Sequence, residues 1–209
     1  MVETRPDQAV NPSMPVDIST KGPSTGVRVP AETGIWVLIF GDLLAFAAFF
    51  GVFMEARGKN PMMFAESSSR LHVAYALVNT ILLVTSSFLI AVAVRSFRNG
   101  ENKSVPRLLV LAAACGLGFV GNKAVEYYDE ISTGVTPSTN LFDTFFFTMT
   151  GVHLLHLIVG LIGLGVMWSV SQRAVREPQD LLIIEIGASY WHLVDVLWLV
   201  IFPLLYLMR

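Results

Sequence analysis

Five long apolar segments dominate this sequence of 209 residues and constrain its fold more than any other feature. Each exceeds the roughly 20 residues that a helix needs to cross the hydrocarbon core of a bilayer. The chain lacks the alternation of apolar and polar residues that is typical of a transmembrane β-barrel. We therefore predict an all-α fold, a polytopic membrane helix bundle of five transmembrane helices. The segments cover residues 34–56, 71–97, 105–130, 139–168 and 182–208.

The composition agrees with this prediction, because charged residues make up 14% of the chain, against roughly 25% in soluble domains. Residues 1–33 are polar and rich in Pro, Ser, Thr and Gly, which predicts a disordered cytoplasmic tail before one transmembrane domain at 34–209. The tail has no apolar stretch, so it is not expected to be a secretory signal peptide. The net charge of −2 and the lack of a basic patch argue against a nucleic-acid partner.

The distribution of Lys and Arg predicts the orientation, because cytoplasmic loops of membrane proteins carry an excess of these residues. The tail and the second and fourth loops together contain nine Lys and Arg, whereas the other side contains four. The N-terminus is therefore expected in the cytoplasm. The nine are Arg5, Lys21, Arg28, Arg95, Arg98, Lys103, Arg107, Arg173 and Arg176, and the four are Arg57, Lys59, Arg70 and Arg209.

Several ionisable residues fall near mid-depth, where each needs a partner or a function. At about 1.5 Å per residue, they lie about 12–22 Å into their helices, so antiparallel neighbours could bring them together. Two polar stripes, each on one helix face, are expected to face protein rather than lipid. The five residues are Asp42, His153, His156, His192 and Asp195, and the stripes are His153, His156, Gly160 and Gly163, and Glu185, Ser189, His192 and Asp195.

The third apolar segment has a special requirement, because its uninterrupted apolar run is too short to cross the membrane alone. Lys123 and Glu126 must complete the crossing, and their spacing of three residues allows them to pair on one helix face. Asn79, about 12 Å into the second helix, is expected to form an interhelical hydrogen bond.

The polar residues leave several functional readings open. Histidines on facing helices could hold a haem, and His153, His156, His192 and Asp195 could form a metal site. One haem would leave a histidine over and two would need four, and a structural hydrogen-bond network accounts for the same residues as the metal site, so we predict no catalytic residue and no metal site. A buried hydrogen-bond network that fixes helix packing is the favoured interpretation. A proton path through Asp42, Glu126 and Asp195 is the functional alternative.

Four short motifs resemble those of the haem-copper oxidase subunit III family, the cytochrome c oxidase subunit 3 family. Residues 190–198 read YWHLVDVLW, which includes Trp191 and Trp198, and are similar to the family's YWHFVDVVW. Residues 150–160 read TGVHLLHLIVG, similar to TGFHGLHVIIG. The EYY of residues 126–128 and the Asn79–Thr80 pair also match, in the family's order and spacing. The resemblance extends over about residues 34–208.

The resemblance implies an accessory, non-redox subunit that supports stability and proton uptake of a respiratory terminal oxidase. It implies that this chain binds no redox cofactor, that haem and copper lie in partner subunits such as the catalytic subunit I, and that phospholipids are structural. The five-helix form resembles bacterial members, which implies a bacterial cell membrane. By the same resemblance Asp42 takes the place of a buried helix Glu, and Glu126, His153, His192 and Asp195 match polar core positions.

Two alternatives stay open at this point. Gly41–Asp42 resembles the branch of the family associated with nitric oxide reductase, whose accessory subunit would have a different partner on the same fold. A small membrane transporter or channel could also line a path with mid-depth His and Asp residues. Broken helices or inverted repeats would favour a transporter, and the sequence contains no sign of either.

Overall fold

The computed structural model describes residues 30–101, 103–173, 177 and 179–208. Over this part of the chain it is helical and contains no strand. The helices are α1 (Pro30–Lys59), α2 (Pro61–Arg70), α3 (Val73–Arg98), α4 (Val105–Ser132), α5 (Leu141–Ser171) and α6 (Asp180–Phe202), followed by the short π-helix η1 (Pro203–Leu207).

The predicted all-α bundle is confirmed, because α1, α3, α4, α5 and α6 are each long and apolar enough to cross a membrane. The short helix α2 was not predicted. It begins at Pro61, a residue that is favourable in the first helical turn because its missing N–H has no intrahelical partner there. The predicted tail lies outside the described residues up to residue 29, and α1 begins at Pro30, four residues before the expected apolar segment.

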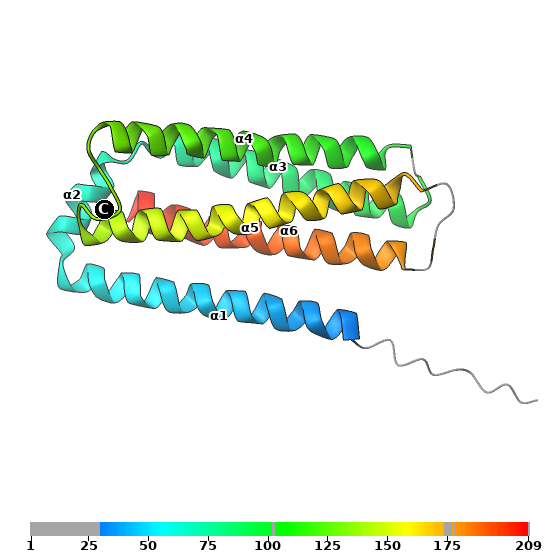
Figure 1. Cartoon of the computed structure of the whole chain (residues 1–209), viewed down its shortest axis with the longest axis horizontal. Coiled ribbons are helices and arrows are strands. Elements are labelled where there is room, and N and C mark those ends of the chain that lie inside the picture. The colour runs from blue at the N-terminus through cyan, green and yellow to red at the C-terminus, as the bar shows by residue number, and fades with distance from the viewer. Residues whose placement is uncertain (1–29, 102, 174–176, 178, 209) are drawn as a thin grey trace, which may run out of the picture.

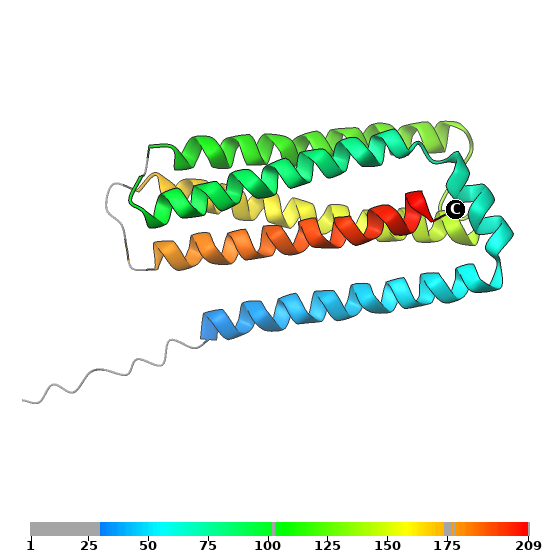
Figure 2. The same cartoon turned by 180° about the vertical axis from the view of Figure 1, so that it is seen from behind.

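Four of the spans form the body of the molecule, and α1 runs along one side of them (Figure 1). The view from behind shows the same order, with α2 connecting α1 to α3 at the end of the bundle where the chain terminates (Figure 2). In their most apolar windows, 56% of the α6 residues are buried but only 11% of the α1 residues. The helix α6 is therefore central, and α1 is peripheral.

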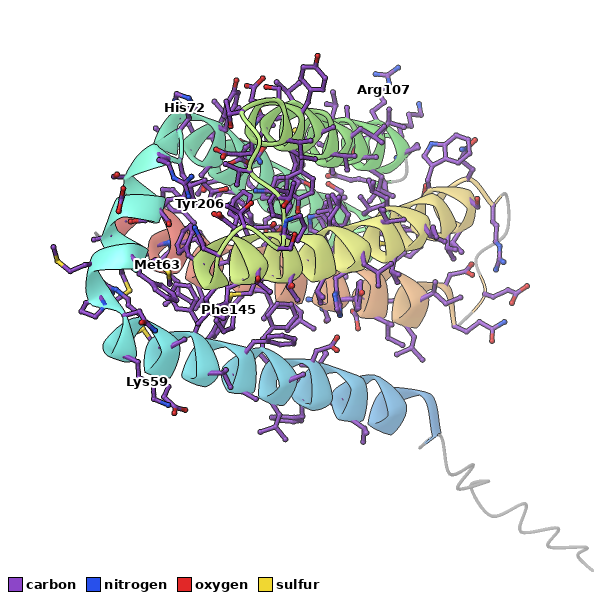
Figure 3. The ribbon with its side chains drawn as sticks, turned by 60° about the vertical axis from the view of Figure 1, so that its left-hand side comes forward. Lys59, Met63, His72, Arg107, Phe145 and Tyr206 are labelled. Carbon is purple, nitrogen blue, oxygen red and sulfur yellow. The ribbon has the colours of Figure 1, made fainter. Side chains whose placement is uncertain are left out.

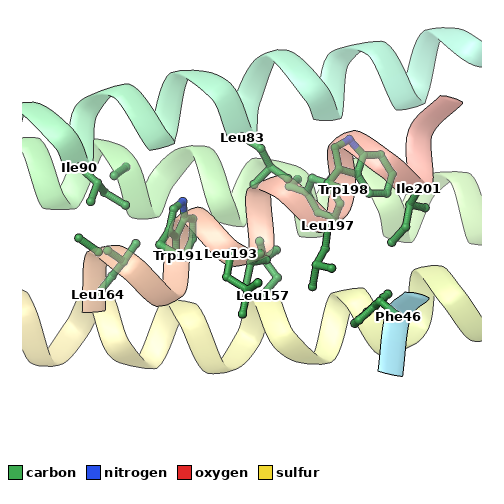
Figure 4. Close-up of a cluster of buried hydrophobic side chains, with 14 of the residues drawn as sticks. Phe46, Leu83, Ile90, Leu157, Leu164, Trp191, Leu193, Leu197, Trp198 and Ile201 are labelled. Atoms are coloured by element: carbon green, nitrogen blue, oxygen red, sulfur yellow. The ribbon is translucent and has the colours of Figure 1, made fainter. Parts of the chain in front are cut away.

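The core forms around α6, where Trp191, Leu197 and Trp198 lie among side chains of α3, α4 and α5 (Figure 4). Phe53 is one of the residues that attach α1, and its ring centroid lies 5.3 Å from that of Phe64 and 5.5 Å from that of Phe145. Figure 3 shows Phe145 on the side of α5 that faces α1.

Turns that contain a glycine with positive φ follow two of the long helices. Gly100 follows α3 with φ of 85°, and Gly134 follows α4 with φ of 87°. Only glycine adopts such left-handed conformations without steric cost. These turns make α4 an antiparallel neighbour of both α3 and α5.

Candidate functional site

A buried ion pair inside the bundle is the most strongly desolvated polar feature of the protein. Lys123 Nζ lies 2.8 Å from Glu126 Oε2, and the side chains are 0% and 2% exposed. Lys123 also donates a hydrogen bond of 2.8 Å to the hydroxyl of Tyr206, and this hydroxyl donates one of 2.6 Å to Glu126 Oε1. The predicted pairing of Lys123 with Glu126 is confirmed, and Tyr206 closes the group into a ring of three.

Aromatic rings enclose this ion pair. Lys123 Nζ lies 4.7 Å from the ring centroid of Phe146 and 5.3–5.5 Å from those of Tyr127, Trp198 and Tyr206. The face of an aromatic ring attracts a cation, most strongly where water is excluded. The ammonium is therefore held by one carboxylate, one hydroxyl and several ring faces, and its side chain is fully buried.

A second polar contact joins the peripheral helix to the bundle. His156 Nε2 on α5 lies 3.4 Å from Asp42 Oδ2 on α1, and the two side chains are 19% and 25% exposed. His156 Nδ1 lies 2.8 Å from the carbonyl oxygen of Val152. A carbonyl oxygen only accepts hydrogen bonds, so Nδ1 must carry a proton.

The position of the proton on His156 determines whether its Nε2 atom attracts or repels the Asp42 carboxylate. A neutral His156 with its proton on Nδ1 presents a lone pair at Nε2, which would repel an ionised Asp42. The contact is favourable if either Nε2 or Asp42 holds one more proton. The Asp42–His156 pair is therefore a contact between titratable side chains of α1 and α5 at membrane depth.

His153 lies in a different environment, although it is only three residues from His156. Its side chain is fully buried, with the ring centroid 5.5 Å from Phe119 and 5.3 Å from Trp198. Neither ring nitrogen has a hydrogen-bond partner among the residues that the structure describes. His153 therefore acts as an aromatic packing residue between α4 and α6.

His192 and Asp195 face α3 rather than α5. Ser87 Oγ on α3 lies 2.6 Å from His192 Nδ1, and Asp195 is 5% exposed. Ser87 lines the same groove as Asp195, but neither carboxylate oxygen of Asp195 has a hydrogen-bond partner within the described chain. These residues line a surface groove between α3 and α6 of about 350 Å³.

The structure therefore does not bring the five mid-depth residues together. The prediction that both polar stripes face protein holds in part for the α6 stripe. Asp195 is buried and His192 contacts Ser87 on α3, whereas Ser189 is exposed and Glu185 lines the α3–α6 groove. The α6 stripe turns toward α3, whereas His156 turns toward α1. No group of three or more His, Cys, Asp or Glu side chains able to hold a metal ion occurs in the described part of the chain.

The residues that were expected to organise packing have mixed outcomes. Asn79 accepts a hydrogen bond of 2.8 Å from Asn122 Nδ2, which confirms the predicted contact between helices. Trp198 Nε1 donates to Thr80 Oγ1 at 3.0 Å and ties α6 to α3. A Cβ at Gly160 would lie 3.0 Å from the Trp191 ring, whereas one at Gly163 would meet no atom within 4 Å. Gly160 thus allows close packing, and Gly163 does not face another described helix.

Sequence reasoning missed two residues that complete polar groups. Tyr206 completes the group of Lys123 and Glu126 on α4, and Ser87 contacts His192 on α6. Tyr206 belongs to η1, which begins at Pro203 and follows α6 directly. A proline inside a helical run is a signal of changed helical geometry, and it could have drawn attention to this turn. A single serine in an apolar helix carries no comparable signal.

Comparison with known proteins gives a consistent result. A family profile described as cytochrome c oxidase subunit III matches residues 19–209. The cytochrome c oxidase subunit 3 of Synechocystis sp. is 31% identical over 176 residues, which cover 84% of this chain and 74% of that protein. The quinol oxidase subunit 3 of Bacillus subtilis is 29% identical over 176 residues, covering 84% and 85% of the two chains. A probable cytochrome c oxidase subunit 3 of Mycobacterium leprae is 29% identical over 185 residues, covering 87% and 88%.

Proposed function

This chain belongs to the cytochrome c oxidase subunit III family and is an accessory subunit of a terminal oxidase, and we propose that it stabilises the catalytic subunit during turnover and supports its proton uptake. The family match over residues 19–209, which include all five spans, carries the proposal. The nitric oxide reductase and transporter alternatives are not favoured by the relatives, which are oxidase subunits.

The partner and the membrane belong to the same proposal. We propose that the chain associates with the catalytic subunit I of a bacterial oxidase, that haem and copper are held by partner subunits, and that phospholipids cover its apolar faces. Exposed apolar side chains on every span support a lipid environment, as on α1 and α4. The excess of Lys and Arg on one side supports a cytoplasmic N-terminus in the inner membrane.

Affinity purification in a mild detergent tests this function. Tagged chain extracted from its native membrane should bring with it a large subunit that shows a haem spectrum and reduces oxygen with cytochrome c or quinol as donor. Mass spectrometry identifies the subunits. A colourless chain without partners, or haem retained by the chain after it is separated from all other subunits, would contradict the proposal.

The Asp42–His156 pair is the part of the structure that best supports a role in proton uptake, because it places two titratable side chains 3.4 Å apart at membrane depth. Asp42→Asn keeps the size of the side chain but gives an amide that does not titrate. A partly exposed ion pair contributes up to about 1 kcal/mol, so the assembled complex should be recovered in normal yield. Its working lifetime during continuous turnover, or its proton uptake per electron, should fall by about two- to fivefold.

The matched control is Asp42→Glu, which retains a titratable carboxyl at the same position. We expect this variant to keep lifetime and proton uptake near the values of the unaltered complex. Proton uptake is followed with a pH-sensitive dye in reconstituted vesicles, and lifetime by oxygen consumption. An Asp42→Asn complex that equals the unaltered one in assembly, lifetime and proton stoichiometry would remove Asp42 from the proposed role.

A further inference from the structure

The groove between α3 and α6 contains polar groups that the described chain does not satisfy. The part of the groove nearer the C-terminal end of α6 is lined by Val84, Ser87, Phe88, Ala91, His192, Asp195, Val196 and Leu199. A second groove of similar size continues along the same two helices and shares Ala91 and His192 with the first. Together they form one shallow groove, called the α3–α6 groove, that runs along the helix axes from Leu199 to Glu185. Its length is about 20 Å at 1.5 Å per residue.

The unsatisfied groups lie at a depth that lipid headgroups do not reach. Asp195 is 15 residues from the start of α6 at Asp180, which places it about 22 Å along the helix, near the middle of a bilayer. Its carboxylate is buried without a well-aligned hydrogen bond within the described residues. Acyl chains provide no hydrogen-bonding group, and a polar group left unsatisfied in hydrocarbon costs several kcal/mol.

The hydrogen bonds within the groove show which chemistry would satisfy it. Ser87 has one hydroxyl proton, and its oxygen lies 2.6 Å from His192 Nδ1 in the groove that Asp195 also lines. When Nδ1–H of His192 donates to Ser87, this hydroxyl proton is available to the Asp195 carboxylate, which only accepts. In this arrangement Nε2 of His192 is an acceptor that is open to the groove. A side chain that donates a hydrogen bond would complete the set.

The shape of the groove fits a helix better than an isolated side chain. Ser87 and Ala91 are four residues apart on α3, a spacing of small residues that lets another transmembrane helix approach closely. Val84, Phe88, Val196 and Leu199 are 47–67% exposed and form apolar walls on both sides. By contrast, the outer face of α4 around Leu117 presents apolar side chains with no buried polar group beside them.

We propose that the α3–α6 groove receives a transmembrane helix of the catalytic oxidase subunit, and that this helix carries a hydrogen-bond donor at the depth of His192 and Asp195. The inference rests on the proposed function, because it assigns one face of this chain to the catalytic partner. The polar set Ser87–His192–Asp195 determines the register of the partner helix, and the apolar walls provide its packing surface.

Photo-crosslinking in the assembled complex tests the proposal. A benzophenone amino acid is placed at Val196, which is 50% exposed in the groove, and in a separate chain at Leu117, which is 62% exposed on α4 at a similar depth. We expect ultraviolet light to join the Val196 variant to the haem-bearing subunit and the Leu117 variant to lipid. The assignment would be overturned if the Val196 variant formed adducts only with lipid or with a different subunit. It would also be overturned if the Val196 variant crosslinked to the haem-bearing subunit no more often than the Leu117 variant does.

A second measurement examines the polar set itself. His192→Leu removes the groups that hydrogen-bond, whereas His192→Gln retains both a donor and an acceptor. The haem-bearing subunit recovered per tagged chain should fall about tenfold in the leucine variant and much less in the glutamine variant. Equal recovery with both variants would contradict the role of His192. The level of tagged chain in the membrane shows whether each variant folds.

The two proposals fail in different ways. An unaltered chain that recovers no haem-bearing subunit would overturn the proposed function. An unaltered chain that recovers this subunit but crosslinks to it from α4 rather than from the groove would overturn only the α3–α6 interface.

Discussion

Glu126→Leu is expected to destabilise the protein by about 3–5 kcal/mol, the largest effect of any single substitution considered for this chain. The substitution removes the carboxylate that lies 2.8 Å from Lys123 Nζ and leaves the ammonium fully buried. The ring faces around Lys123 attract a cation, but each contributes only about 0.5–2 kcal/mol. They cannot replace the ion pair, and Tyr206 would lose the acceptor of its hydrogen bond.

Removing both charges should cost less than removing one. A buried ion pair that is replaced by apolar residues of similar volume is often neutral in stability, because the desolvation cost disappears together with the attraction. The double variant Lys123→Leu with Glu126→Leu should therefore recover much of the loss. This recovery would distinguish an uncompensated charge from a simple packing defect.

The chain provides a matched control in Glu55, which pairs with Lys59 on α1 at 2.6 Å with both side chains more than 60% exposed. Glu55→Leu removes the same kind of interaction and should change stability by less than about 1 kcal/mol. Unfolding in mixed detergent, monitored by the loss of helicity, gives the free energies of unfolding of the unaltered chain, Glu126→Leu, the double variant and Glu55→Leu. A Glu126→Leu variant as stable as Glu55→Leu would show that the buried pair contributes little.

The second large effect is expected where Trp191 packs between two helices. A Cβ at Gly116 on α4 would lie 2.8 Å from Cη2 of Trp191 and 3.0 Å from Leu161, and one at Gly160 on α5 would lie 3.0 Å from Cε3 of Trp191. Both distances are shorter than normal carbon contacts, and the indole is fully buried and cannot turn away. Gly116→Ala should cost about 1–3 kcal/mol, and Gly160→Ala a similar or smaller amount.

Gly163→Ala is the matched control, because it lies three residues after Gly160 on the same helix and a methyl group there meets no atom within 4 Å. Alanine has a higher helix propensity than glycine by about 1 kcal/mol in water, so this variant should be neutral or slightly more stable. Intrinsic tryptophan fluorescence and thermal unfolding report the result. Equal losses at Gly160 and Gly163 would mean that the contact with Trp191 does not limit the packing.

The different outcomes for these two glycines show how far sequence reasoning reached. Both lie on the face of α5 that was expected to pack closely, and they are separated by less than one helical turn. The sequence correctly predicted that a helix approaches at Gly160, where Trp191 fits. It could not show where that contact ends, because the crossing of two helices determines which residues still face each other.

The histidines show the same limit for the polar groups, because their depth could be predicted from the sequence and their partners could not. His153, His156 and His192 could be placed near mid-depth from their positions along the helices. Their partners are different, since His156 contacts Asp42 on α1 and His192 contacts Ser87 on α3. The α5 and α6 residues, which antiparallel packing could have brought together, do not meet at one site, because the rotation of α6 about its axis directs its polar stripe toward α3.

The sequence by itself determined the five membrane spans, the pairing of Lys123 with Glu126 and the interhelical role of Asn79. These features depend on the length of apolar runs and on spacing within one helix, which the properties of hydrocarbon and the helix repeat fix directly. Only the tertiary structure decided that Tyr206 closes the ion pair, that Gly163 faces no described helix and that the α3–α6 groove holds an unsatisfied carboxylate. In a membrane, lipid is as apolar as the protein core, so hydrophobicity does not indicate which side of a helix faces protein. The rotation and partners of each helix therefore follow from packing and hydrogen bonds between segments that are distant in the sequence.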